Sequence, residues 1–218
     1  MRLALTGSLV CVALFLAALP SSHGAEGPVA WSATSGGHVR GEWSVDLRGG
    51  WPRFAARAQV GVGKGWSPTL ELVGTPSWRV EPSLGVAKSV LRGSKGRLVL
   101  ELLAGWQVQT GSLAQRGPSL VARVRPLLQG KKAGFWASLG TRHTVLFDRT
   151  TRRSVEGTEV SWSARHRWSP EIGFGGVFVL TPQVSLTVGL DLTFVDLGTI
   201  ALSLPGFQAG LQFGRGAP

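Results

Sequence analysis

The sequence is poor in residues on which several common classes of protein depend. It has no tyrosine and one cysteine, Cys11, and only 16% of its residues are charged, where about a quarter is usual for soluble domains. Cys11 lies in an apolar N-terminal segment, so the remainder of the chain has no thiol for a disulfide or for catalysis. After residue 24 no apolar run reaches the roughly 18 residues of a transmembrane helix. This part of the chain could therefore cross a membrane only as a closed β-barrel.

The N-terminus has the three parts of a secretory signal. Met1-Arg2 supplies a positive charge, residues 3–19 are predominantly apolar, and Pro20 to Gly24 ends the run with small residues. This pattern predicts a cleaved signal peptide over 1–24, followed by a Gly/Ser-rich lead-in segment over 25–37. A retained membrane anchor is the alternative, and Pro20 disfavours it.

The formal net charge of +11 raises the question of a polyanionic partner. Nucleic-acid binders cluster lysine and arginine on one face or in one run. Here the basic residues are mostly arginine and are spread one or two per segment. We therefore expect no nucleic-acid partner. At 218 residues the chain is long enough for one domain.

From residue 39 onward, apolar and polar residues alternate almost without interruption. Over 97–109, for example, Leu100, Leu102 and Trp106 share one parity, and Glu101 and Gln107 share the other. Because successive side chains of a strand point to opposite faces, such segments are expected to be strands with one apolar face. The segments are 39–48, 53–63, 65–74, 78–90, 97–109, 118–128, 134–147, 158–180, 184–195 and 205–214, with a further short strand at 29–33.

The number of strands and the lengths of the links indicate the fold. Short links alternate with longer ones at 110–117, 148–157 and 196–204, as in bacterial barrels with short periplasmic turns and longer outer loops. We predict an all-β, transmembrane antiparallel up-and-down β-barrel of about ten strands (eight to twelve) over 38–214, with a tail at 215–218. Pro170 is expected on the polar side of the long strand. A soluble secreted or periplasmic β-sandwich binding protein also alternates and is the alternative.

Two further sets of residues follow from the alternation. Aromatic residues of the apolar parity should form a girdle at each end of the barrel: Trp66, Trp78, Trp106, Phe135, Phe147, Trp168, Phe178, Phe194 and Phe213. Charged residues of the other parity should line the lumen: Arg40, Glu42, Asp46, Arg57, Glu71, Arg79, Glu81, Glu101, Arg123, Arg125, Arg142, Glu171 and Asp191. Interleaved signs favour an ion-pair network that fills the lumen, and the alternative is a small anion-leaning pore.

The segment 168–195, WSPEIGFGGVFVLTPQVSLTVGLDLTFV, resembles the hairpin near the end of small bacterial outer-membrane β-barrel proteins, those similar to the OmpA-type barrel domain. The resemblance implies a porin-like barrel in the outer membrane of a Gram-negative bacterium, here without a peptidoglycan-binding domain. It also implies that Phe213, near the end of the last strand, is recognised by the barrel assembly machinery.

No arrangement of residues predicts catalysis. The histidines outside the signal segment, His38, His143 and His166, do not share the polar parity with a Ser/Asp pair, and no metal-ligand spacing is present. We therefore expect a non-enzymatic protein with no cofactor and a structural or surface-interaction role. The basic outer loop 148–157 carries Arg149, Arg152 and Arg153. We expect outer-membrane lipid as a partner of the protein, and lipopolysaccharide phosphates are the candidate partners of this loop.

Overall fold

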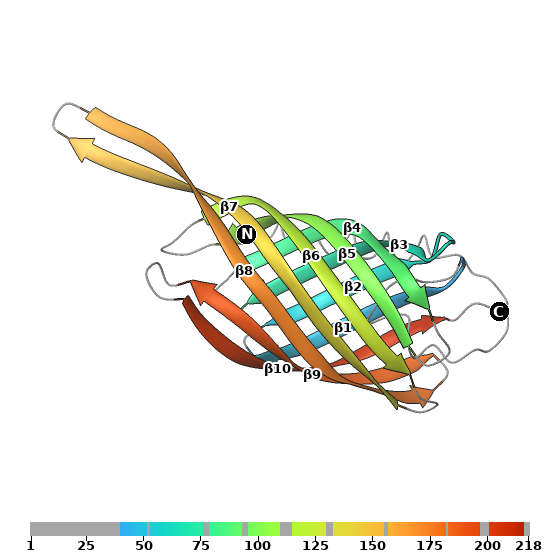
Figure 1. The fold of residues 1–218 in the computed structure, drawn as a ribbon. Helices are drawn as coiled ribbons and strands as arrows, with labels where there is room; N and C mark the ends of the chain where they lie inside the picture. Colours follow the sequence, from blue (N-terminus) through green and yellow to red (C-terminus); the bar gives the residue numbers. More distant parts are fainter. Residues whose placement is uncertain are drawn as a thin grey trace.

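The computed structural model describes residues 40–51, 53–75, 79–92, 96–109, 115–129, 133–154, 157–181, 183–196 and 201–215. They form one closed barrel of ten antiparallel strands (Figure 1). The strands are β1 Trp43–Trp51, β2 Phe54–Val60, β3 Trp66–Thr75, β4 Arg79–Arg92, β5 Gly96–Gln109, β6 Gln115–Gln129, β7 Ala133–Ser154, β8 Gly157–Thr181, β9 Val184–Asp196 and β10 Ala201–Arg215.

This architecture confirms the predicted all-β, up-and-down antiparallel barrel and makes the β-sandwich alternative wrong. Each strand pairs with its neighbours in sequence, and β1 closes the ring on β10, from Trp43 opposite Arg215 to Trp51 opposite Phe207. Closure leaves no free sheet edge within the barrel wall. The predicted signal peptide, the predicted lead-in segment and the short strand expected in it lie outside the described residues. No helix among the described residues is long and apolar enough to span a membrane.

The barrel has two different ends. At one, which we call the turn end, β2 is linked to β3 and β8 to β9 by tight turns. Gly63, Lys64 and Gly65 have φ of 103°, 51° and 73°, a conformation that glycine adopts without steric cost. Between β8 and β9, the Thr181 hydroxyl accepts hydrogen bonds from the backbone N–H groups of Gln183 (3.3 Å) and Val184 (3.1 Å). Turn chemistry thus fixes the register of the 168–195 hairpin.

At the other end, β7 and β8 extend well beyond the barrel as a two-stranded projection, which we call the ribbon (Figure 1). The prediction of a loop over 148–157 was wrong, because β7 continues to Ser154, which pairs with Gly157. Strands β6 and β10 also begin within the predicted loops, at Gln115 and Ala201. Six polar residues follow Asp148 without an apolar one, so this extension of β7 lacks the alternation by which the other strands were recognised.

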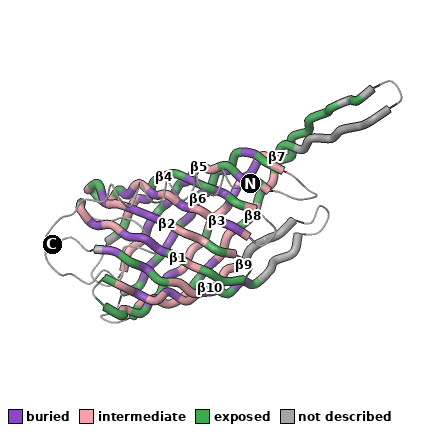
Figure 2. Tube along the Cα trace, turned by 180° about the vertical axis from the view of Figure 1, so that it is seen from behind, coloured by how far each residue is buried: buried purple, intermediate pink, exposed green. Residues whose placement is uncertain are grey.

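Exposure alternates along the strands of the barrel wall (Figure 2). On β5, Glu101 and Gln107 are buried, whereas Leu100 and Leu102 are 43% and 50% exposed. The apolar parity therefore lies outside and the polar parity inside. Pro170 corrects one expectation, since it is exposed like Trp168, two residues earlier, and lies on the outer parity. Pro170 immediately precedes Glu171, the first residue of β8 that pairs with β9. The N–H that proline lacks therefore interrupts no pairing between β8 and β9.

Candidate functional site

The lumen gathers most of the charged residues that the alternation assigned to it. Nine of the predicted residues are buried, namely Glu42, Asp46, Arg57, Glu71, Glu81, Glu101, Arg123, Arg125 and Arg142. Arg79, Glu171 and Asp191 are partly buried. Arg40 is the exception, because it is exposed in a turn before β1 begins at Trp43, four residues later than expected. Arg40 therefore does not line the barrel wall.

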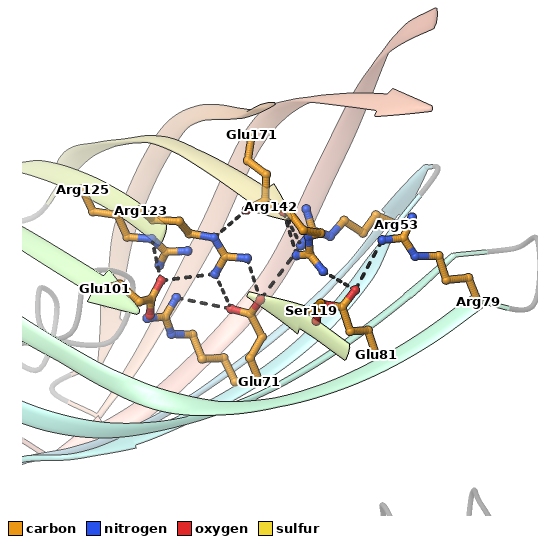
Figure 3. A network of polar contacts seen from close by, with 11 residues as sticks. Arg53, Glu71, Arg79, Glu81, Glu101, Ser119, Arg123, Arg125, Arg142 and Glu171 are labelled. Carbon is orange, nitrogen blue, oxygen red and sulfur yellow. Dashed lines mark hydrogen bonds and ion pairs between the residues drawn. The ribbon is translucent and has the colours of Figure 1, made fainter. Parts of the chain in front are cut away.

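Arg123 is the centre of the network in the lumen (Figure 3). Its Nη1 and Nη2 each donate to one carboxylate oxygen of Glu71, both at 2.8 Å. Its Nε donates to Glu171 at 2.6 Å, and Nη1 also reaches Glu101 at 3.2 Å. One guanidinium thus uses its planar fork to hold three carboxylates, which a lysine could not do in this geometry.

Further arginines complete the surroundings of those carboxylates. Arg57 pairs with Glu101 and lies 3.5 Å from Glu71. The Nε of Arg125 lies 3.5 Å from Glu101, whose side chain is fully buried. Burial of an ion is costly unless it is paired, so removing one member of the cluster would leave a buried charge with fewer partners.

A second group adjoins the first through Glu171. Arg142 donates to Glu171 at 2.7 Å and also pairs with Glu81. Glu81 in turn lies 3.3 Å from Arg79 and accepts a hydrogen bond from the Ser119 hydroxyl at 2.6 Å. These contacts make the two groups one continuous network (Figure 3).

The network crosses the barrel rather than following one wall. Glu71 is on β3 and Glu171 on β8, and these strands are separated by five steps in either direction around the ring. Arg123 on β6 bonds to both. Side chains from opposite walls therefore meet in the lumen.

The space left in this part of the lumen is small. The larger cavity has a volume of ≈ 50 Å³ and is lined by residues of the network together with Asp46, Arg48, Trp136 and Asp191. The second, of ≈ 40 Å³, lies beside Arg79 and Arg142. Since one water needs about 10–15 Å³, each cavity has room for only a few water molecules.

Trp136 is a lumen residue that the sequence reasoning missed. It is buried, and the Arg48 guanidinium lies 4.9 Å from its ring. Its indole occupies the space beside three glycines, since a Cβ on Gly175 or Gly173 would lie 3.0 or 3.3 Å from the ring and one on Gly189 closer still. The signal in the sequence was the set of glycines on the polar parity of β8 and β9, which leave room in the lumen for a large side chain such as Trp136.

The outer surface bears the predicted aromatic residues near both ends. Trp66, Phe135, Phe178 and Phe213 are exposed near the turn end, and Trp106, Phe147 and Trp168 are exposed near the other. Trp51 adds an exposed aromatic that was not predicted, and it pairs with Phe207. The side chains of Trp78 and Phe194 lie outside the described residues.

The predicted basic surface segment has a described backbone only. Arg149, Arg152 and Arg153 belong to β7, opposite Trp162, Glu159 and Thr158 of β8, and their side chains lie outside the described residues. Within the described part of the chain, no three or more His, Cys, Asp or Glu residues gather as they would around a metal ion. The expectation of no cofactor stays a prediction.

Comparison with known proteins gives similarities of fold. No family model and no curated protein sequence matches the chain. Solved structures with a similar fold include the N-terminal β-barrel domain of Pseudomonas aeruginosa OprF (11% identity, 79% of this chain and 95% of that one, TM-score 0.35), the NanC porin (14%, 79% and 98%, 0.37) and Neisserial surface protein A (14%, 79% and 92%, 0.31). The chain is similar to outer-membrane β-barrel proteins. At these identities the likeness concerns the fold alone.

Proposed function

We propose that this chain is a non-enzymatic outer-membrane β-barrel with a structural or surface-interaction role, whose lumen is closed to ion flow. The outer surface supports the location. Leu84, Leu102 and Leu139 are 62%, 50% and 60% exposed midway along the parts of their strands that lie in the barrel wall, between two zones of exposed aromatic residues. A water-exposed belt of this kind would favour aggregation, whereas in a bilayer it faces lipid tails, with the aromatics at the interfaces.

One observation carries the proposal of a closed lumen, namely the pairing of Arg123 with Glu71 and Glu171 on opposite walls. An open aqueous passage through a barrel of this size would require the lumen side chains to leave a continuous gap. The contacts of Arg123 instead join the walls, and cavities of ≈ 50 and ≈ 40 Å³ flank the network.

The orientation follows from the two ends. Bacterial barrels place short turns in the periplasm and longer segments outside, so we place the turn end inward and the ribbon outward. In this orientation Phe213 of β10 is near the periplasmic rim, where the barrel assembly machinery would act. The basic segment of the ribbon would meet lipopolysaccharide phosphates, to which arginine binds well.

The test has two parts. Detergent-extracted protein should migrate differently on a gel before and after heating, and ready solubility without detergent would contradict the barrel's place in a membrane. In planar bilayers the wild-type protein should show no steady current. Arg123→Ala, which removes the residue joining the two walls, should show openings that the matched outward variant Leu139→Ala does not.

A small anion-leaning pore is the second candidate. The larger cavity is lined by five arginines and four carboxylates, Arg48, Arg53, Arg57, Arg123 and Arg125 against Asp46, Glu71, Glu171 and Asp191, and an excess of positive charge favours anions. A steady wild-type current whose ion selectivity changes in Arg123→Glu would favour this candidate over the closed lumen.

A further inference from the structure

Two histidines meet on the outer face where the ribbon leaves the barrel. The outermost pair between β6 and β7 is Arg116 with Phe147, and β9 begins to pair with β8 at Glu171. Beyond these points the described residues of β7 and β8 pair only with each other (Figures 1 and 2). His143 on β7 and His166 on β8 lie at this root.

Their placement follows from strand register. His143 pairs with Trp168, and Val145 pairs with His166, so the two histidines are diagonal neighbours on the same face of the hairpin. Diagonal side chains of this kind are close enough for long or aromatic side chains to touch. The Nε2 of His143 lies 3.2 Å from the Nδ1 of His166.

The surroundings hold the rings in place and leave them accessible. The two imidazoles are nearly parallel, at 16°, with their centroids 5.3 Å apart. Trp168 stacks on His143 with a centroid distance of 4.3 Å. His166 is exposed and His143 partly exposed, so solvent reaches the pair.

We propose that His143 and His166 form a binding site for a divalent transition-metal ion. Metal–imidazole bonds are about 2.0–2.1 Å long, so two nitrogens bound to one ion at angles of about 90–110° lie about 2.9–3.4 Å apart. The nitrogens here are 3.2 Å apart. A metal ion would replace the shared hydrogen bond once the two rings have turned so that the lone pairs of both nitrogens converge on it.

The ligands indicate the class of metal. Imidazole suits zinc, copper and nickel, and copper(II) binds most tightly in the usual order of affinity. No third His, Cys, Asp or Glu joins the pair among the described residues, so water would occupy the remaining positions and the ion would stay exchangeable. Arg165 and Arg167 alternate with His166 along β8 and therefore have the opposite parity.

Copper(II) titration of the full-length folded protein in detergent tests the site. The wild type should bind one ion with two imidazole nitrogens, detected by electron paramagnetic resonance. His143→Asn and His166→Asn should each weaken this binding roughly 10²-fold, the lower end of the gain from linking two binding groups. The double variant measures background binding, and heat-dependent gel migration shows that each variant is folded.

His38 provides the matched control, because it is the third histidine outside the signal segment. His38→Asn should bind copper(II) like the wild type. Trp168→Phe should retain binding but lose part of the fluorescence quenching by the metal, since Trp168 stacks on a ligand. A wild type that binds no more tightly than the double variant, or a spectrum with a single imidazole nitrogen, would overturn the proposal, as would loss of binding in His38→Asn.

Discussion

Replacing Arg123 by methionine should destabilise the barrel more than any other single charge removal in the lumen. The substitution removes hydrogen bonds to Glu71 (two, both 2.8 Å), Glu171 (2.6 Å) and Glu101 (3.2 Å) while keeping most of the side-chain volume. Removing one partner of a buried pair typically costs about 3–5 kcal/mol, because the other charge is left buried without compensation.

The structure shows where that cost would arise. Without Arg123, Glu171 retains Arg142 at 2.7 Å, and Glu101 retains Arg57. Among the described residues, Glu71 retains only the more distant Arg57, at 3.5 Å, and Arg53, at 4.0 Å. Most of the loss should therefore come from Glu71. Adding Glu71→Gln should recover part of it, with an interaction energy of about 0.5–3 kcal/mol in the double-mutant cycle.

Urea-induced unfolding in lipid vesicles, followed by tryptophan fluorescence and gel migration, measures these free energies. Arg79→Met is the matched control. Arg79 pairs with one described carboxylate, Glu81, at 3.3 Å, and its side chain is 21% exposed, so its removal should cost about 1 kcal/mol or less. Equal losses in Arg123→Met and Arg79→Met, or additive effects of Arg123→Met and Glu71→Gln, would refute the central role of Arg123.

Three other predictions concern the wall, the tryptophan and the ribbon. Leu139→Arg, midway along the barrel part of β7, should lower the stability in vesicles by about 2–4 kcal/mol, whereas Leu180→Arg at the turn end should cost about 0–1; equal effects would contradict a lipid-facing wall. Gly189→Val should displace Trp136 and cost about 1–3 kcal/mol by overpacking. The control Gly49→Ala, with nothing within 4 Å of the added Cβ, should change the free energy of unfolding by no more than about 0.5 kcal/mol in the same urea assay. If Gly189→Val left the stability unchanged, the packing of Trp136 against Gly189 would be refuted. Replacing Arg149–Trp162 by Asn-Gly, a two-residue hairpin turn, should leave heat-dependent gel migration unchanged, since the ribbon pairs only with itself; loss of the folded form would show that the barrel needs it.

Sequence reasoning predicted the barrel because lipid and lumen impose opposite requirements on neighbouring residues. Every strand within the wall must alternate, so the amino-acid sequence alone assigned Leu100 and Leu102 outward and Glu101 inward, as they lie in the barrel. Where both faces of a strand meet water, its residues need not alternate, so the pattern cannot reveal the strand. For that reason the ribbon beyond Asp148 was mistaken for a loop, although its backbone pairs as far as Ser154 and Gly157.

The pairing of side chains within the lumen could not be predicted from the sequence, for a different reason. Parity shows that Glu71, Arg123 and Glu171 point inward, but their pairing depends on strand tilt and on which walls face each other across the closed ring. Likewise, Trp136 follows Phe135 in a segment dominated by outward apolar residues. Only the glycines of β8 and β9 make room for it inside.

The arrangement of charge and exposure limits where this protein can meet other molecules. Inside, the arginines and carboxylates are largely occupied with one another across the lumen. On the described outer wall, the exposed middle of the strands is apolar and suited to lipid. The ribbon and its root remain, with exposed Trp162, Trp168 and His166 carried on the part of β7 and β8 where the described residues of β8 pair with no strand but β7. If the lumen is closed, any interaction with other molecules at the surface should depend on the ribbon and its root. The variant in which Asn-Gly replaces Arg149–Trp162 should therefore lose such an interaction, whereas Arg123→Met should keep it.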